Sequence, residues 1–193
     1  MPKIGMEPLR REALVAATIA EIGAHRTLDV TVSQIARRAG MSSGLAHHYF
    51  GGKDQIFQAA MRTILRDFGA EVCRSLRAAR TSRARLDAII DASFAPICFA
   101  PDTISAWMTL YASAPSTPDT KRLLDLYQSR LRSNLIHALR PLSSEASDIA
   151  DTIAALIDGL YLHAAVTRSQ SIDHARSTAQ QTLTVLLAAS RYR

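Results

Sequence analysis

The sequence has little cysteine, glycine and proline. Its 193 residues include two cysteines, Cys73 and Cys98, with eight glycines and seven prolines. The cysteines do not form a CxxC pair, so neither a disulfide framework nor a zinc site is indicated. We expect two reduced and mostly buried thiols. The low glycine and proline content, with 48% hydrophobic residues, argues against long disordered segments and predicts a globular chain with a real core.

Signals for secretion or membrane insertion are also missing. The N-terminal stretch MPKIGMEPLRREAL carries charges where a signal peptide needs an apolar core. We expect no apolar run of the ~18 residues that a membrane span needs. We therefore expect a cytoplasmic protein. The formal net charge of +6 favours an anionic partner, although charge alone does not establish nucleic-acid binding.

Strand-like alternation is absent, and apolar residues recur at helical spacing along nearly the whole chain. The predicted fold class is all-α, with about nine helices: a three-helix N-terminal domain, residues 1–54, joined by a long helix to a helical bundle, residues 55–193. The first helix, over residues 7–24, is expected to place on one face Leu9, Ala13, Ala16, Ala17, Ala20 and Ile22. Later helices are expected at about 32–40, 43–49, 53–79, 84–99, from 101 through Tyr111, 118–139, 143–166 and 172–190.

Two short helices joined by a glycine turn precede the long helix. Thr31 followed by Gln34 fits a capping box, so a helix should begin at about Val32. Gly40 can take the left-handed conformation that ends a helix, and Ser42 or the next serine can cap the following one. Three helices in ~45 residues, the last two joined by a tight turn, form a candidate helix-turn-helix motif.

The second short helix is predicted to enter the major groove of DNA. Its inward contacts should come from Ile35, Ala39, Met41, Ala46 and Tyr49. The outward face presents small, polar or hydrogen-bonding groups of a size that fits the groove. Arg37, Arg38 and Lys53 flank this face, and Lys53 begins the next helix, where backbone N–H groups favour a phosphate. The predicted DNA contacts are Thr31, Gln34, Arg37, Ser42, Ser43, Gly44, Leu45, His47, His48, Tyr49 and Lys53.

The adjacent histidines also have other interpretations. Metal-binding histidines on a helix usually stand at i,i+3 or i,i+4, because adjacent side chains point about 100° apart. A catalytic histidine needs an acid or a nucleophile beside it, and only Ser42 and Ser43 lie close to His47 and His48 in sequence. A partly solvated helix face is the simplest alternative. We expect no catalytic residue, no metal site and no cofactor.

The stretch TVSQIARRAGMSSGLAHHYFGGKDQIF, residues 31–57, resembles the N-terminal domain of TetR-family repressors. In that family the recognition helix ends on a Tyr-Phe pair, followed by a Gly/Lys turn into a long helix. Further motifs resemble the choline-responsive members that repress glycine betaine synthesis genes. They are MPKIGMEPLRR (1–11), AWMTLYAS (106–113), SRLRSNLI (129–136) and AALIDGLYLHAA (154–165). The family usually has tyrosine where this chain has His47, and often threonine or isoleucine at Leu45, which leaves the operator sequence open.

This resemblance implies a homodimeric repressor, not an enzyme, that binds double-stranded DNA at a near-palindromic operator and a small cationic effector such as choline. A quaternary ammonium has no N–H to donate, so it is held by aromatic faces and sometimes by a carboxylate. The expected ligand-binding residues are Trp107, Tyr111, Asp158, Tyr161, Phe94, Phe99 and Tyr127. Aromatic residues at helical spacing are often plain core, and Asp158 could instead satisfy an arginine or a helix cap.

The resemblance also implies dimerisation through the last two helices. Their apolar residues Ile149, Ile153, Leu156, Leu160, Leu183, Leu186 and Leu187 could build a four-helix interface, an intramolecular core, or both. Two further functions stay open. One is a TetR-type regulator of another pathway, such as multidrug efflux or fatty-acid metabolism. The other is a helical ligand-binding protein or enzyme that does not bind DNA, although no catalytic constellation favours it.

Overall fold

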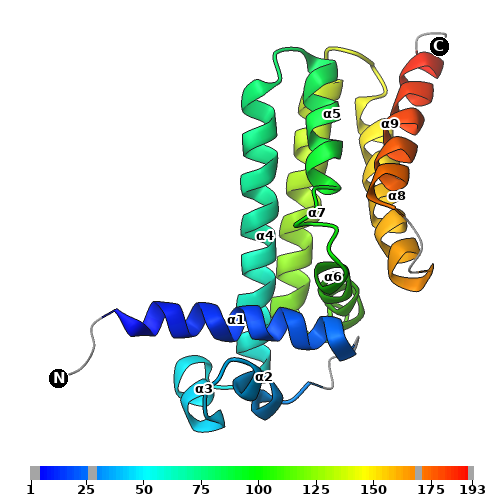
Figure 1. Cartoon of the computed structure of the whole chain (residues 1–193). Helices are drawn as coiled ribbons and strands as arrows, with labels where there is room; N and C mark the ends of the chain where they lie inside the picture. Colours follow the sequence, from blue (N-terminus) through cyan, green and yellow to red (C-terminus); the bar gives the residue numbers. More distant parts are fainter. Residues whose placement is uncertain (1–4, 26–29, 168–170, 191–193) are drawn as a thin grey trace. The chain divides into compact units, whose positions relative to one another are not determined.

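The computed structural model describes residues 5–25, 30–167 and 171–190, and within these ranges every regular element is an α-helix. Residues 1–4 of the MPKIGMEPLRR motif lie outside the described part. The all-α prediction and the expected number of helices are confirmed for the described residues. The nine helices, shown in Figure 1, are α1 (Met6–His25), α2 (Val32–Arg38), α3 (Ser43–Phe50), α4 (Lys53–Ala78), α5 (Ser82–Ser93), α6 (Pro101–Ser113), α7 (Pro118–Leu139), α8 (Ala146–Thr167) and α9 (Ile172–Ala189).

The predicted boundaries of α2 and α3 are confirmed by their caps. The Thr31 hydroxyl accepts a hydrogen bond from the Gln34 backbone at 3.2 Å, and the Gln34 side chain accepts one from the Thr31 backbone at 2.7 Å. This reciprocal pair is a capping box. Gly40, at φ +66°, follows the end of α2, and the Ser42 hydroxyl accepts from the Leu45 backbone at 3.2 Å. Local chemistry therefore fixes the turn between the two helices.

The helix predicted over residues 84–99 has different limits. Thr81 caps α5, which begins at Ser82 and ends at Ser93, and a series of turns follows. Pro96 explains the early end, because proline has no backbone N–H and disfavours helical geometry in the residue before it. Ile97, expected on the apolar side of the helix, is instead 58% exposed in the turn. The start of α8, at Ala146, also comes later than predicted.

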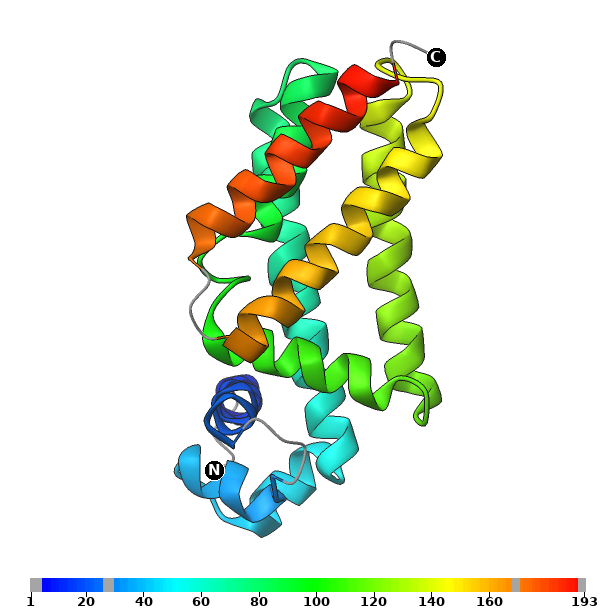
Figure 2. The ribbon, with the colours of Figure 1, turned by 90° about the vertical axis from the view of Figure 1, so that its right-hand side faces the viewer.

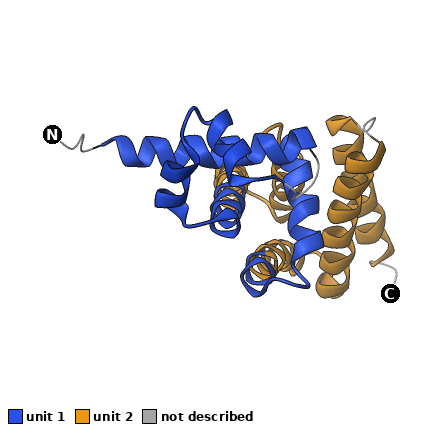
Figure 3. Ribbon diagram, turned by 90° about the horizontal axis from the view of Figure 1, so that it is seen from below, with its two compact units in different colours: residues 1–64, 101–123 blue, residues 65–100, 124–193 orange. Residues whose placement is uncertain are grey.

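The helices form two compact units, coloured separately in Figure 3. Unit 1 comprises residues 1–64 and 101–123, and unit 2 comprises residues 65–100 and 124–193. Unit 1 thus contains α6 as well as the three N-terminal helices. The predicted domains, divided near residue 54, separate DNA binding from effector binding and dimerisation, whereas the two units are separated by their packing. The functional division stays a prediction.

In unit 1, α1 packs against both α2 and α6, and α2 packs against α3. Figures 1 and 2 show α2 and α3 on the same side of α1. The face of α1 that is buried agrees with the predicted one at Ala17 and Ile22 and differs elsewhere. It consists of Leu14, Ala17, Thr18, Glu21 and Ile22. Leu9, expected to face inward, is 58% exposed, and Ala16 is exposed as well. The Thr18 hydroxyl is satisfied within the helix, by donating to the Leu14 carbonyl at 2.8 Å.

In unit 2, α9 packs against α8 and against α5, and Figure 2 shows α8 and α9 side by side. The largest fully buried side chains of this unit are Leu86, Ile89, Ile90, Phe94, Leu135 and Leu139. Cys98 is buried, and burial raises the pKa of its thiol to about 11, with the Glu71 and Asp67 carboxylates adding to the effect. Cys73 is exposed, so the expectation of two mostly buried thiols is correct for only one of them.

Helix α8 is more apolar than the sequence pattern suggested. By length and composition alone it could cross a membrane, with a mean hydropathy of 1.4 over its most apolar window of 18 residues. The expectation that no stretch reaches this length is therefore wrong. A third of that window is buried inside the protein, and a core helix passes the same test. Helices that pack on more than one side are hydrophobic around most of their circumference.

Candidate functional site

The outward face of α3 lies where the helix-turn-helix prediction places it. Gly44, His47 and His48 are exposed, and Ser43 and Leu45 are half-buried. Ala46 has no exposed surface and anchors the opposite side of α3. Because these exposed groups include hydrogen-bonding side chains on a short helix, this face has the chemistry needed to reach base edges in a major groove.

Helix α1 holds the C-terminal end of α3 through two arginines that sequence reasoning missed. Arg11 donates from Nη1 to the Tyr49 backbone carbonyl at 2.6 Å, and its guanidinium lies over the Phe50 ring, 4.5 Å from the centroid. Arg10 donates to the Tyr49 hydroxyl at 3.3 Å. Tyr49, predicted as a DNA contact, is thus also a structural link between α1 and α3. The Tyr49-Phe50 pair was visible in the sequence, but its arginine partners lie 38 or more residues earlier.

Several predicted DNA contacts also have local structural roles. The Ser43 hydroxyl donates to the Ser33 hydroxyl at 3.0 Å and so links α3 to α2. The side chains of Thr31, Gln34 and Ser42 form the helix caps described above. Capping fixes the start of each helix in space, and hydroxyl and amide groups at such positions are well placed to meet a DNA backbone. Their contact with DNA stays a prediction.

Two arginines at the end of α2 have different surroundings. Arg38 donates from Nε to the Glu21 carboxylate at 2.5 Å and so ties α2 to α1. Glu21 is only 5% exposed and also contacts His25 Nε2 at 3.1 Å. The hydrogen bond from Arg38 is the main cause that lowers the pKa of Glu21, against the opposing effect of its burial. Arg37 is exposed and Lys53 is half-buried at the start of α4, and their contact with phosphates stays a prediction.

Helices α1 and α6 approach each other closely at Gly23. A Cβ added to Gly23 would overlap the Asp102 carboxyl group and would lie 2.7 Å from the Cβ of Asp102. Rotation of the Asp102 side chain moves its carboxyl group but not its Cβ, so only a shift of a helix could relieve this overlap. Glycine at position 23 is therefore what allows the first turn of α6 to lie directly on α1. Nothing in the sequence pattern distinguished this glycine.

Helix α6 carries two of the predicted effector-binding residues. The rings of Trp107 and Tyr111 lie one helical turn apart, with 6.3 Å between their centroids and 44° between their planes. Trp107 is 5% exposed, and Tyr111 is half-buried. The structure thus confirms that the two rings share one face of α6. It places both of them in unit 1, whereas the other predicted effector residues belong to unit 2.

Three of those residues form an aromatic cluster in the core of unit 2. Phe94, Phe99 and Tyr161 are all buried, with 5.0 to 6.0 Å between the ring centroids of each pair. The Tyr161 hydroxyl donates to the Ser93 carbonyl at 2.5 Å, and the Cys98 carbonyl lies 3.3 Å away. The cluster thereby satisfies the Ser93 carbonyl, at the end of α5, and contacts the Cys98 carbonyl in the turns that follow. Its geometry is that of a packed core, which was the alternative interpretation.

Asp158 and Tyr127 form a second pair in unit 2. The Tyr127 hydroxyl donates to Asp158 Oδ1 at 3.4 Å. The Phe68 and Tyr127 rings pack edge to face, with 5.7 Å between their centroids. Tyr127 is buried, and Asp158 is half-buried within the apolar helix α8. A carboxylate that accepts a hydrogen bond from a tyrosine has groups of the kind that can surround a quaternary ammonium, which is attracted to aromatic ring faces and to negative charge.

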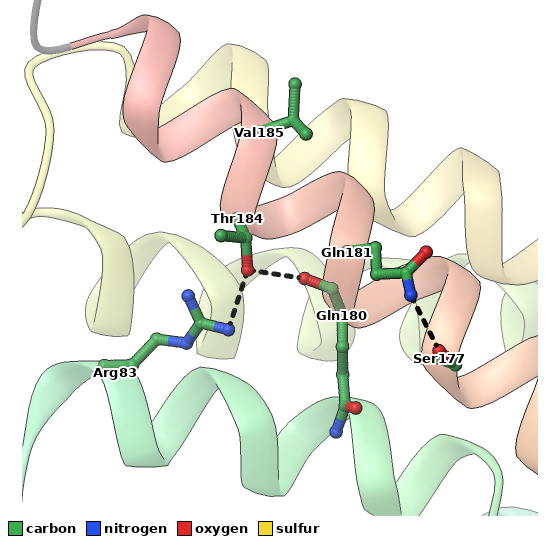
Figure 4. A pocket seen from close by; sticks show the side chains of 6 residues that line it. All are labelled: Arg83, Ser177, Gln180, Gln181, Thr184 and Val185. Carbon is green, nitrogen blue, oxygen red and sulfur yellow. Dashed lines mark hydrogen bonds between the residues drawn. The ribbon is translucent and has the colours of Figure 1, made fainter.

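An open groove of about 600 Å³ lies between α5 and α9, as Figure 4 shows. Arg83 donates to the Thr184 hydroxyl at 3.0 Å across it, and the Gln181 amide donates to Ser177 at 3.1 Å. The rest of its lining is Gln180 and Val185. This lining is polar and has no aromatic ring, so it does not suit a quaternary ammonium.

Comparison with known proteins agrees with this architecture. Residues 14–60 match the family model of bacterial regulatory proteins of the tetR family, and residues 82–188 match the model of the BetI-type transcriptional repressor C-terminal domain. The chain belongs to the TetR family of transcriptional regulators. Its C-terminal domain is of the BetI type, and proteins of this family are regulators and not enzymes.

Individual proteins are similar to the chain over most of its length. The chain is 51% identical to the HTH-type transcriptional regulator BetI of Brucella anthropi over 168 residues. This match covers 86% of the chain and 87% of that protein. A putative transcriptional regulator of Pseudomonas aeruginosa has a crystal structure with a TM-score of 0.81 and 25% identity, covering 96% and 95% of the two chains. A putative transcriptional regulator of Saccharomonospora viridis, solved in complex with choline, has a TM-score of 0.77 and 20% identity. The match covers 90% of this chain and 95% of that one.

Proposed function

We propose that this BetI-type repressor controls the genes that convert choline to glycine betaine and that choline, or a closely related quaternary ammonium, modulates its binding to DNA. The observation that carries the proposal is the 51% identity to a BetI protein along 86% of the chain, including both the helix-turn-helix and the C-terminal domain. A solved protein of the same fold holds choline, which is consistent with this effector class. We also propose that the protein acts in the cytoplasm, where its DNA lies.

The DNA-binding form is proposed to be a homodimer. The residues predicted for the interface are in large part core, because Ile149, Ile153, Leu160, Leu183 and Leu187 are buried within the protomer. Leu156 and Leu186 are half-buried. Both helices nevertheless keep exposed apolar side chains, namely Leu162 (55%), Val166 (73%) and Val185 (66%). Exposed apolar side chains on adjacent helices are typical of an interface with a second copy.

In such a dimer the two α3 helices would read a near-palindromic operator in major grooves about one turn of DNA apart, ~34 Å. Contacts from Arg37 and Lys53 to phosphates would give salt-dependent affinity, and the exposed face of α3 would give sequence preference. A TetR-type regulator of another pathway is the alternative. It would share these DNA contacts and differ in its effector.

The effector would act by favouring one of two arrangements of the DNA-binding helices, within the limit set by its differential affinity for them. Helix α4, which begins directly after α3, would transmit this change. We propose a second route within unit 1. Trp107 and Tyr111 lie on α6, the first turn of α6 lies on α1 at Gly23, and α1 holds α3 through Arg11.

The proposal is tested by measuring operator affinity at increasing choline concentration in the wild type and in Trp107→Ala. We expect millimolar choline to change the affinity of the wild type and to quench its tryptophan fluorescence, since Trp107 is the only tryptophan. Trp107→Ala should bind the operator without responding to choline. If choline has no effect while a flat hydrophobic compound does, the choline assignment is wrong and the alternative pathway is favoured.

A further inference from the structure

The turn after α3 constrains the side chain of His47. Gly51 stands at φ +81°, a conformation that favours glycine, and its N–H donates to the His47 carbonyl at 2.7 Å to close the last turn of the helix. In the same turn, the Gly51 carbonyl lies 3.0 Å from Nδ1 of the His47 ring. The backbone therefore contacts His47 twice, once at its carbonyl and once at its side chain.

This contact determines where the ring carries its proton. A carbonyl oxygen can only accept a hydrogen bond, so Nδ1 of His47 must be the donor. A neutral imidazole has one N–H, and once it is on Nδ1 the other nitrogen, Nε2, has only a lone pair. His47 is exposed on the face of α3 that we propose enters the groove. We infer that neutral His47 presents Nε2 to DNA as a hydrogen-bond acceptor and selects a base with an exocyclic amino group.

The two kinds of DNA group that His47 could meet respond differently to an acceptor. Phosphate oxygens are themselves acceptors, so a neutral Nε2 cannot bind them. In the major groove, cytosine offers its N4 amino group and adenine its N6 amino group as donors. Guanine presents O6 and N7, and thymine presents O4 and a methyl group, which give Nε2 no donor. The inference therefore names cytosine or adenine as the base that faces His47.

The first test uses operator DNA and rests on the proposed function. At about pH 8, where an ordinary imidazole is mainly neutral, every base pair of the operator half-site is replaced in turn and the affinity is measured. Every base pair carries one such amino group, but its place across the groove differs, so the wild type should prefer one base pair at one position by roughly fivefold to tenfold. His47→Ala should lose the preference at that position only. His137→Ala, which removes an exposed histidine of α7 that is not among the predicted DNA contacts, is the control and should keep it.

The second test needs no DNA, so its result does not depend on whether the proposed function is correct. Two-bond ¹H–¹⁵N correlation spectra of the histidine-labelled protein distinguish the two neutral tautomers, and His47→Ala assigns the signal. The spectrum should show the proton of His47 on Nδ1. A proton on Nε2 overturns the inference. So does an unchanged affinity when the exocyclic amino group of the cytosine or adenine at the position that His47→Ala affects is replaced by hydrogen.

Discussion

Replacement of Gly23 by alanine should loosen the packing of α1 on α6. The added Cβ would lie 2.7 Å from the Cβ of Asp102, whereas non-bonded carbon atoms normally approach to about 3.5–4.0 Å. The helices must therefore separate locally by roughly 1 Å, because no side-chain rotation moves either Cβ atom. Gly23 lies in the last part of α1, the helix that holds α3 through Arg11 and α2 through Glu21.

The magnitude follows from two opposing contributions to the free energy of unfolding. Overpacking of a closely packed site costs about 1–3 kcal/mol. Alanine in place of glycine inside a helix contributes about 1 kcal/mol in the other direction. Gly23→Ala should thus lower the free energy of unfolding by roughly 0–2 kcal/mol. A better measure is the difference from Gly69→Ala in α4, where an added Cβ meets no neighbouring atom within 4 Å.

Urea unfolding of the two variants measures this difference directly, with equal slopes as the check that only stability has changed. Gly23→Ala should be about 1–3 kcal/mol less stable than Gly69→Ala. Asp102→Gly removes the opposing Cβ, so adding it to Gly23→Ala should recover most of that deficit in a double-mutant cycle. Equal stability of the two alanine variants, or no coupling between positions 23 and 102, would refute the reasoning.

Three further predictions concern other parts of the molecule. The pKa of Glu21 is lowered from 4.5, so its pairing with Arg38 stabilises the fold above about pH 4.5. This contribution to the free energy of unfolding is lost as the pH falls through the lower pKa of the folded state. In urea unfolding, Glu21→Gln should therefore lower the free energy of unfolding by roughly 1–3 kcal/mol at neutral pH, and by less in acid. Val185→Asp should shift the sedimentation coefficient from that of a dimer to that of a monomer. Ile97→Asp, at a similarly exposed site outside α8 and α9, should stay dimeric. A monomeric wild type would contradict the proposed dimer interface. Lys53→Ala should reduce the slope of operator affinity against salt, on logarithmic axes, by about one unit if Lys53 neutralises one phosphate, and an unchanged slope would show that it neutralises none.

Local signals in the sequence were enough to predict most helix boundaries. The Thr31 and Ser42 caps and the Gly40 turn depend on residues within about four positions of one another, so their chemistry can be read from the chain itself. Similarity to TetR proteins is the basis of the DNA-reading role that we propose for α3. The inward direction of Ala46 was also predictable, since a short helix can bury only one face.

Interactions between distant residues could not be predicted in the same way. Hydrophobic spacing placed Leu9 on the buried face of α1, but that face includes Glu21, which is stabilised there by Arg38 from another helix. Aromatic composition also did not show that the Tyr161 hydroxyl would donate to the Ser93 carbonyl, 68 residues earlier in the chain. The close approach of Gly23 to Asp102 joins residues far apart in the chain, and a single sequence contains no signal for it.

The central claim, that this protein is an operator-binding repressor with α3 as its reading helix, is tested most directly by titrating it against the DNA upstream of its own gene at several salt concentrations. We predict a discrete complex that is much tighter than binding to random DNA of the same length and that weakens linearly in log–log form as salt increases. Equal affinity for the two DNAs, or the absence of any complex at low salt, would contradict it.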